Sequence, residues 1–190
     1  MNNNIYRIYT PAEKKYPLIH DLVIRNLVVN ADPRGTLTEV MKTNWEGFYN
    51  LKERPFAQCY FSVTEPSVAR DQSDWHFHPG GQVDRFSVIS GDLILAVYDI
   101  REKSPTKDLL NLFLLGESLG RENQYSVLVP PQALHGFLVV SRKPATLINF
   151  PSRLYDPKEE LRLPFRDYLL PDGSEFSWNK VKNAFEKYDK

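Results

Sequence analysis

Short runs of apolar residues, separated by turn-forming residues, follow one another from Asp21 to Ser152. The runs include DLVIRNLVV, FAQCYFSVT, VDRFSVIS, LILAVYDI, YSVLVP, HGFLVVS and ATLINF, and they are rich in β-branched and aromatic residues. Gly, Pro, Asn and Asp lie between them, and Ser90-Gly91-Asp92 has the composition of a hairpin turn. No long amphipathic helix interrupts the series, so the pattern predicts an all-β sandwich or barrel.

The two ends of the chain depart from this pattern. Residues 1–20 mix polar and apolar positions, and we expect them to form an N-terminal arm or a strand exchanged with a partner chain. Residues 21–178 are expected to form one domain, as is usual for a chain of 190 residues. In residues 179–190, Val181, Phe185 and Tyr188 recur at helical spacing, which predicts a short C-terminal helix docked on the domain.

Composition narrows the range of partners. Lys plus Arg and Asp plus Glu are balanced at 24 each, so no overall field attracts nucleic acid or acidic lipid. The single cysteine, Cys59, excludes an internal disulfide and is typical of a protein from a reducing compartment. The sequence has no signal-peptide core and no apolar stretch of membrane-spanning length, so we expect a cytoplasmic protein without membrane or nucleic-acid partners.

The segment DWHFHPGGQ carries the first chemical signal, because it contains His76 and His78. Residues two apart on a strand point to the same face, so the two imidazoles are predicted to lie side by side. A third imidazole, His135, follows a proline pair in VPPQALHGF. One use of this arrangement is a divalent transition-metal site, with His76, His78 and His135 as ligands and Gln82 or Asp84 as the fourth.

A second use of the same histidines is general base catalysis. A histidine can remove a proton from a carbon next to a ketone if a carboxylate fixes its tautomer and stabilises the imidazolium. His76 is the candidate base, and Asp167 is the candidate carboxylate.

Five sequence blocks, in the same order, resemble motifs of the dTDP-4-dehydrorhamnose 3,5-epimerase family. They are DPRGTLTE, FAQCYFSVT, SGDLILAVYDIREKSPT, VPPQALHGF and YDPKEE followed by Asp167. The resemblance covers about Asp21 to Trp178. It implies a homodimeric cupin fold, which is a double-stranded β-helix or jelly-roll sandwich. It also implies epimerisation of a nucleotide-linked 4-keto-6-deoxy sugar without a metal or redox cofactor.

The resemblance assigns roles to individual residues. It implies that His76 is the base and Asp167 its partner. The family's lysine beside the enolate falls at Asp84 in this chain, so the adjacent Arg85 is our candidate for that positive charge, with His135 as another donor. The substrate-binding candidates are Arg34, Glu39, Gln58, Tyr60, Arg85, His135, Asn149 and Tyr155.

The chain also departs from the family pattern. Asn149 stands where the family has its general-acid tyrosine, which leaves Tyr60, Tyr155 or water to protonate the second face. Leu37 replaces a base-stacking aromatic residue, and His78 stands where the family tends to have Gln. Two other functions therefore remain open: a metal-dependent cupin enzyme that uses His76, His78, Gln82 and His135, and a non-catalytic sugar-binding cupin.

Overall fold

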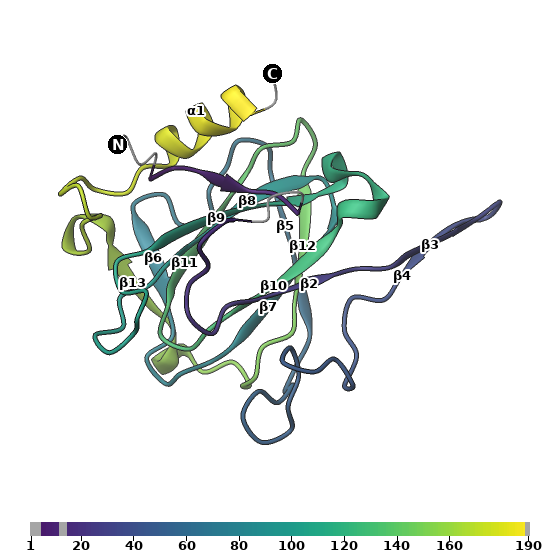
Figure 1. Ribbon diagram of the computed structural model, residues 1–190, viewed down its shortest axis with the longest axis horizontal. Coiled ribbons are helices and arrows are strands. Elements are labelled where there is room, and N and C mark those ends of the chain that lie inside the picture. The colour runs from purple at the N-terminus through teal and green to yellow at the C-terminus, as the bar shows by residue number, and fades with distance from the viewer. Residues whose placement is uncertain (1–4, 12–14, 189–190) are drawn as a thin grey trace.

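The computed structural model describes residues 5–11 and 15–188, and they form two packed β-sheets with one short helix (Figure 1). The six-stranded sheet has the order β1 (Ile8–Tyr9), β9 (Leu110–Gly116), β8 (Asp92–Tyr98), β11 (Leu134–Val139), β6 (Asp74–Phe77) and β13 (Leu161–Pro164). The five-stranded sheet has the order β2 (Val23–Asn26), β10 (Tyr125–Val129), β7 (Asp84–Ser90), β12 (Ala145–Asn149) and β5 (Tyr60–Thr64). The predicted all-β sandwich with a short C-terminal helix is confirmed.

Strand β8 shows why the six-stranded sheet reads as a nearly continuous apolar run. Leu93 and Leu95 point into the core between the two sheets, whereas Ile94 and Ala96 point to the outer face. All four residues are fully buried. Alternation of polar and apolar residues is therefore absent here, because both faces of the sheet are covered.

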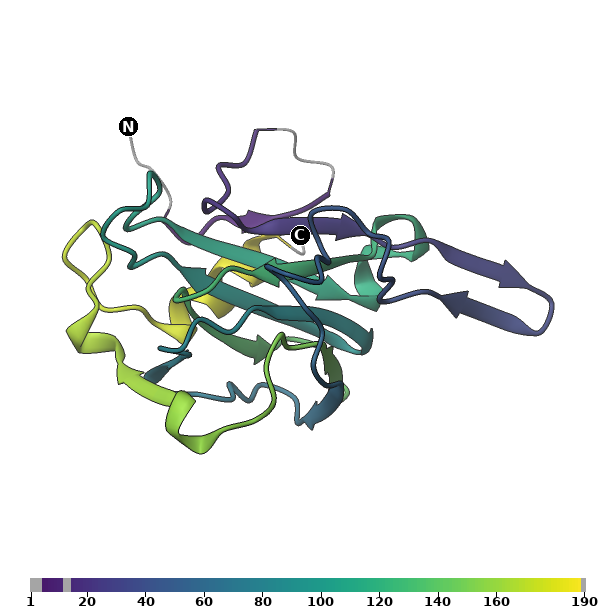
Figure 2. The ribbon, with the colours of Figure 1, turned by 90° about the horizontal axis from the view of Figure 1, so that it is seen from below.

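The C-terminal segment covers the outer face of the six-stranded sheet. Helix α1 (Trp178–Tyr188) lies along it (Figure 2), with Trp178 and Val181 buried against the aromatic cluster around Trp75. The predicted helix is thus confirmed as far as Tyr188, and residues 189–190 lie outside the described part of the chain.

The N-terminal segment joins the same sheet. Strand β1 pairs in parallel with β9 of its own chain, with Ile8 opposite Leu112. Ile8 is buried in the cluster beneath α1. Residues 1–4 and 12–14 of the predicted arm lie outside the described residues.

The turn that joins β7 to β8 lies within the sandwich, whereas a hairpin projects from it. The predicted turn between β7 and β8 is present, with Gly91 at φ 74°, and a Cβ there would lie 2.7 Å from the carbonyl oxygen of Pro144. By contrast, β3 (Val29–Asp32) and β4 (Gly35–Thr38) form a hairpin that projects from the body of the molecule (Figure 1).

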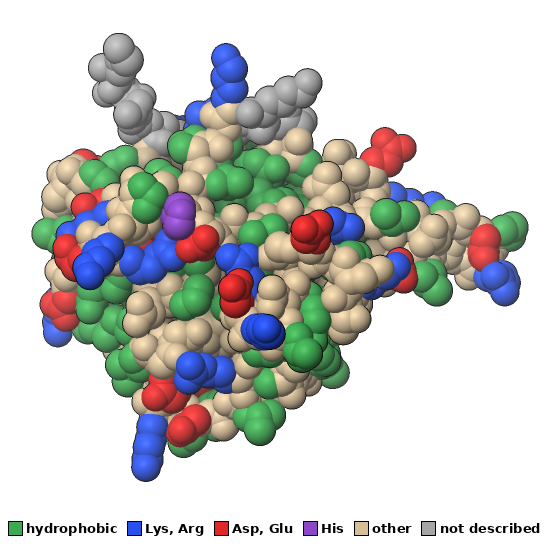
Figure 3. Space-filling model, turned by 60° about the horizontal axis from the view of Figure 1, so that its bottom comes forward, with side chains coloured by type: hydrophobic (Ala, Val, Ile, Leu, Met, Phe, Trp, Pro, Cys, Tyr) green, Lys and Arg blue, Asp and Glu red, His purple; other side chains and the backbone are tan. Residues whose placement is uncertain are grey.

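The surface agrees with the balanced composition. The face in Figure 3 carries acidic and basic side chains interspersed, with hydrophobic side chains along the projecting hairpin. Within the described residues, no helix has the length and apolar character needed to span a membrane.

Candidate active site

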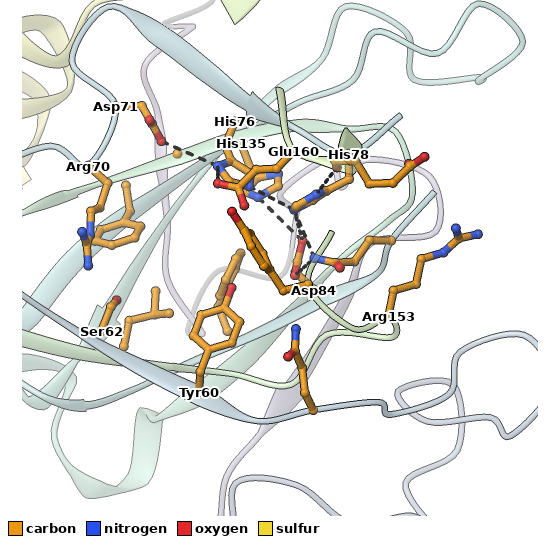
Figure 4. Close-up of a pocket in the computed structure, with 18 of the residues that line it drawn as sticks. Tyr60, Ser62, Arg70, Asp71, His76, His78, Asp84, His135, Arg153 and Glu160 are labelled. Atoms are coloured by element: carbon orange, nitrogen blue, oxygen red, sulfur yellow. Dashed lines mark hydrogen bonds and ion pairs between the residues drawn. The ribbon is translucent and has the colours of Figure 1, made fainter. Parts of the chain in front are cut away.

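A pocket of about 620 Å³ opens between the two sheets and contains the predicted histidines. His76 on β6 lies directly opposite His135 on β11 in the strand register, and His78 is the residue that directly follows β6. Asp84, at the start of β7, comes from the other sheet. Pairing and alternation thus bring the three imidazoles and this carboxylate together (Figure 4), as the spacing predicted for the histidines.

The ring nitrogens of His78 and His135 lie beside the buried carboxylate of Asp84, and a ring nitrogen of His76 lies beside His78. Nε2 of His76 is 3.0 Å from Nε2 of His78. Nε2 of His78 is 3.3 Å and Nε2 of His135 is 3.7 Å from Oδ2 of Asp84. That oxygen is buried and has no hydrogen-bond partner among the described residues. The centre of the group therefore contains several electron-pair donors and a negative charge.

The opposite ring nitrogens face acceptors. Nδ1 of His78 is 3.0 Å from the carbonyl oxygen of Glu159, and Nδ1 of His135 is 3.3 Å from that of Ala133. Nδ1 of His76 is 3.9 Å from a carboxylate oxygen of both Asp71 and Glu160. Carbonyl oxygens only accept hydrogen bonds, so Nδ1 of His78 and Nδ1 of His135 carry protons. The two carboxylates near Nδ1 of His76 favour the same tautomer for that ring. The Nε2 lone pairs of His76 and His135 consequently face the centre.

Burial and neighbouring charges separate the pKa values of these groups. Burial, together with His135 and His78, lowers the pKa of His76 to about 2. Burial also lowers the pKa of His135 to about 4. Burial acts in the same direction on His78, but the Asp84 carboxylate, with Oδ2 at 3.3 Å from Nε2, outweighs it and raises the pKa of His78. His76 is therefore neutral near pH 7, and His78 is the ring that most readily holds a proton.

The structure corrects the prediction that Asp167 orients His76. Asp167 is 58% exposed, lies 3.9 Å from Arg166, and does not line the pocket. Asp71 and Glu160 lie beside His76 instead, and both pair with Arg162. Strand β13 pairs with β6 so that Arg162 lies opposite His76, and this pairing brings the acidic residues to the ring.

The prediction that Arg85 stabilises an enolate is also corrected. Residues alternate along β7, so Asp84 faces the pocket and Arg85 faces away from it. The Arg85 guanidinium is fully buried and donates to the carbonyl oxygens of Phe48, Arg54, Pro55 and Phe150 at 2.6–3.2 Å. These hydrogen bonds hold residues 48–55, which precede β5, against the sandwich.

Asn149 and Tyr60 form a pair across β12 and β5, where they are direct partners in the register. Nδ2 of Asn149 donates to the Tyr60 hydroxyl at 2.9 Å and to Oδ1 of Asp84 at 2.8 Å. Burial and the charge of Asp84 raise the pKa of Tyr60 to about 12. The phenol is therefore protonated and faces the pocket.

The remaining predicted residues divide into two groups. Gln58 and Tyr155 line the pocket, and Gln82 donates to Oδ1 of Asp84 at 2.8 Å. Arg34, which is paired with Asp32 on the projecting hairpin, and Glu39, which is paired with Lys42, do not line it.

Sequence reasoning missed several residues of the pocket. Asp71, Arg153 and Arg162 were not predicted, and Glu160 reads as a surface charge from its place in the run PKEE. These residues lie on irregular segments or a short edge strand, where no periodicity shows which way a side chain points.

Comparison with known proteins agrees with this geometry. The model of a family described as dTDP-4-dehydrorhamnose 3,5-epimerase matches residues 17–176. The chain belongs to the dTDP-4-dehydrorhamnose 3,5-epimerase family. The prediction of an isomerase, an epimerase of this family, is thereby confirmed.

Relatives within and around the family show how far the likeness extends. The probable low-salt glycan biosynthesis epimerase Agl13 of Haloferax volcanii is 40% identical over 152 residues, which are 78% of this chain and 90% of that protein. The spore coat polysaccharide biosynthesis protein SpsL of Bacillus subtilis is 29% identical over 164 residues, which are 85% of this chain and 97% of that protein. The crystal structure of a dTDP sugar isomerase from Desulfovibrio desulfuricans G20 superposes with a TM-score of 0.71 at 25% identity. The superposition covers 86% of this chain and 96% of that one.

The structural role of Arg85 gives a direct test. Arg85→Met should lower the free energy of unfolding by about 3 kcal/mol or more, because the substitution leaves buried carbonyl groups without donors. Urea denaturation measures this change, and Arg142→Met, at an exposed position, is the control. A stable Arg85→Met protein that has lost only activity would restore the catalytic assignment of Arg85.

Proposed function

We propose that the protein epimerises a nucleotide-linked 4-keto-6-deoxy sugar by removing a proton from the carbon next to the ketone and returning it to the opposite face. The observation that carries this proposal is the neutral His76 ring in the pocket, with its Nε2 lone pair directed inward. Family membership supplies the reaction class. Proton removal and return change no oxidation state, so the proposed reaction needs no redox cofactor.

His76 acts as the base in this proposal. A base must be unprotonated before it reacts, and the low pKa of His76 ensures this state. The same low pKa makes the imidazolium costly. Asp71 and Glu160, each 3.9 Å from Nδ1, offset that cost when the carbon proton arrives, and they hold the ring in the tautomer with the proton on Nδ1. They replace Asp167 in the role predicted for it.

Tyr60 acts as the general acid. Asn149 occupies the position of the family's tyrosine, and its direct partner across the two strands is Tyr60. The Tyr60 phenol is protonated and belongs to the five-stranded sheet, whereas His76 belongs to the six-stranded sheet. A sugar held between the sheets would therefore meet the base on one face and the acid on the other.

The pocket has groups suited to a sugar diphosphate. Arg70 and Arg153 line it, and within residues 5–11 and 15–188 neither makes an ion pair. Guanidinium groups bind phosphate oxygens in a bidentate manner. Tyr155 is 67% exposed at the mouth and offers a ring for stacking. Structures of similar fold have been solved with dTDP-linked sugars bound, which supports a nucleotide sugar as substrate.

We also propose a homodimer that works in the cytoplasm on a sugar for polysaccharide synthesis. Exposed Val28 and Leu37 on and next to the projecting hairpin, and Phe61 and Val63 on edge strand β5, supply apolar surface for a second copy. Arg34 and Glu39, which lie away from the pocket of their own chain, could then contribute to the site of the partner chain. The name of the Bacillus subtilis relative supports the biosynthetic role.

Replacement of His76 tests the base. His76→Ala should reduce solvent deuterium incorporation into dTDP-4-keto-6-deoxyglucose by about 100-fold or more, since a general base contributes at least that factor. Mass spectrometry measures the incorporation, and Asp167→Asn serves as the control with unchanged exchange. Undiminished exchange in a folded His76→Ala protein would assign the base to another group. No exchange in the wild-type protein with any nucleotide sugar would favour a non-catalytic sugar-binding cupin.

Replacement of Tyr60 separates the two proton transfers. Tyr60→Phe should still exchange the carbon proton, because His76 remains, but it should form the epimer about 100-fold more slowly. NMR of the product gives both quantities, with Tyr155→Phe as the comparison. If Tyr60→Phe forms the epimer at the wild-type rate while Tyr155→Phe does not, Tyr155 is the acid.

A further inference from the structure

Three ring nitrogens in the pocket lie close together, and one carboxylate oxygen lies beside two of them. They are Nε2 of His76, His78 and His135 and Oδ2 of Asp84. The histidine ligand atoms lie within 4.8 Å of one another. In a tetrahedral site with bonds of about 2.0–2.2 Å, neighbouring ligand atoms are about 3.4 Å apart. Three of the six distances in such a site are near that value: 3.0 Å from His76 to His78, 3.3 Å from His78 to Asp84 and 3.7 Å from His135 to Asp84.

The outer partners of the rings match those of metal ligands. A histidine that binds a metal usually donates its other N–H group to a carbonyl or carboxylate oxygen. His78 and His135 face carbonyl oxygens in this way, and His76 faces Asp71 and Glu160. Each ring is therefore held with Nε2 toward the centre before any cation arrives.

Asp84 provides a second, independent indication. Its side chain is 1% exposed, and Oδ1 is satisfied by Gln82 and Asn149. Oδ2, on the side of the histidines, has no hydrogen-bond partner among the described residues. A buried carboxylate oxygen is costly unless a positive charge lies beside it. Protonated His78, 3.3 Å away, supplies that charge in the metal-free protein, and a bound metal ion would supply it in place of the proton.

We propose that His76, His78, His135 and Asp84 form a binding site for one divalent transition-metal ion such as Zn²⁺ or Co²⁺. Three imidazoles and one carboxylate are a common ligand set for these ions. Asp84 is the fourth ligand in place of Gln82, whose amide nitrogen donates to Asp84.

The site has a consequence that rests on the proposed function. A metal ion would use the Nε2 lone pair of His76, which is the pair that removes the carbon proton. Metal binding and proton abstraction therefore exclude each other, and the ion acts as an inhibitor of the epimerase.

Metal binding is tested on the protein alone. Chelator-treated protein is titrated with Zn²⁺ by calorimetry and with Co²⁺ by visible absorption. We expect one ion per chain and at least tenfold weaker binding in both His78→Ala and Asp84→Asn. His20→Ala is the matched control, because His20 is exposed and lies outside the pocket. Circular dichroism verifies that each variant is folded, and Asp84→Asn keeps the test valid if His78→Ala does not fold.

The possible results separate the two proposals. The metal site is overturned if binding is not saturable, or if His20→Ala weakens binding and Asp84→Asn does not. In that case the metal-free protein should still show exchange activity, so the proposed function stands. One bound ion that lowers exchange in proportion to occupancy, with recovery on adding chelator, supports the site and its inhibitory effect. One bound ion that leaves exchange unchanged or raises it overturns the inhibition and removes His76 from the role of base.

Discussion

A buried carboxylate is the constraint on which the rest of the pocket depends. Asp84 has almost no exposed surface, yet interaction with His78 and His135 lowers its pKa to about 2 despite burial. An isolated charge in such a place would cost several kcal/mol. The carboxylate is held by donors from Gln82 and Asn149 on one oxygen and by the histidines near the other. The charge of the neighbouring His78 ring follows from this carboxylate.

The same charge explains why the neighbouring histidines His76 and His78 differ in pKa. His78, close to Asp84, has a raised pKa, whereas His76, two residues earlier, has a strongly lowered one. Two rings in contact thus differ in protonation, and of the two only His76 has an unprotonated Nε2 that can accept a proton. The partnership of Tyr60 and Asn149 extends this arrangement to the opposite sheet, since Asn149 bonds both the phenol and Asp84.

Local periodicity was sufficient to predict part of this structure. The strands, the turn at Gly91 and the shared face of His76 and His78 all follow from spacing and composition. The outward direction of Arg85 could also have been predicted, because alternation places it opposite Asp84. The role given to Asp167 could not be corrected in this way. Glu160, one of the two carboxylates beside His76, depends on the return of β13 to the edge of β6, a long-range pairing that leaves no local pattern.

The tautomers of the three histidines test the central claim most directly. ¹⁵N NMR of metal-free protein with labelled histidine reports the protonation of each ring nitrogen. Between the pKa of His135, about 4, and about pH 6.5, the ordinary pKa of imidazole, we expect His76 and His135 to be neutral with the proton on Nδ1, and His78 to carry protons on both nitrogens. A proton on Nε2 of His76 would contradict the account, because no lone pair would then face the substrate or a metal ion.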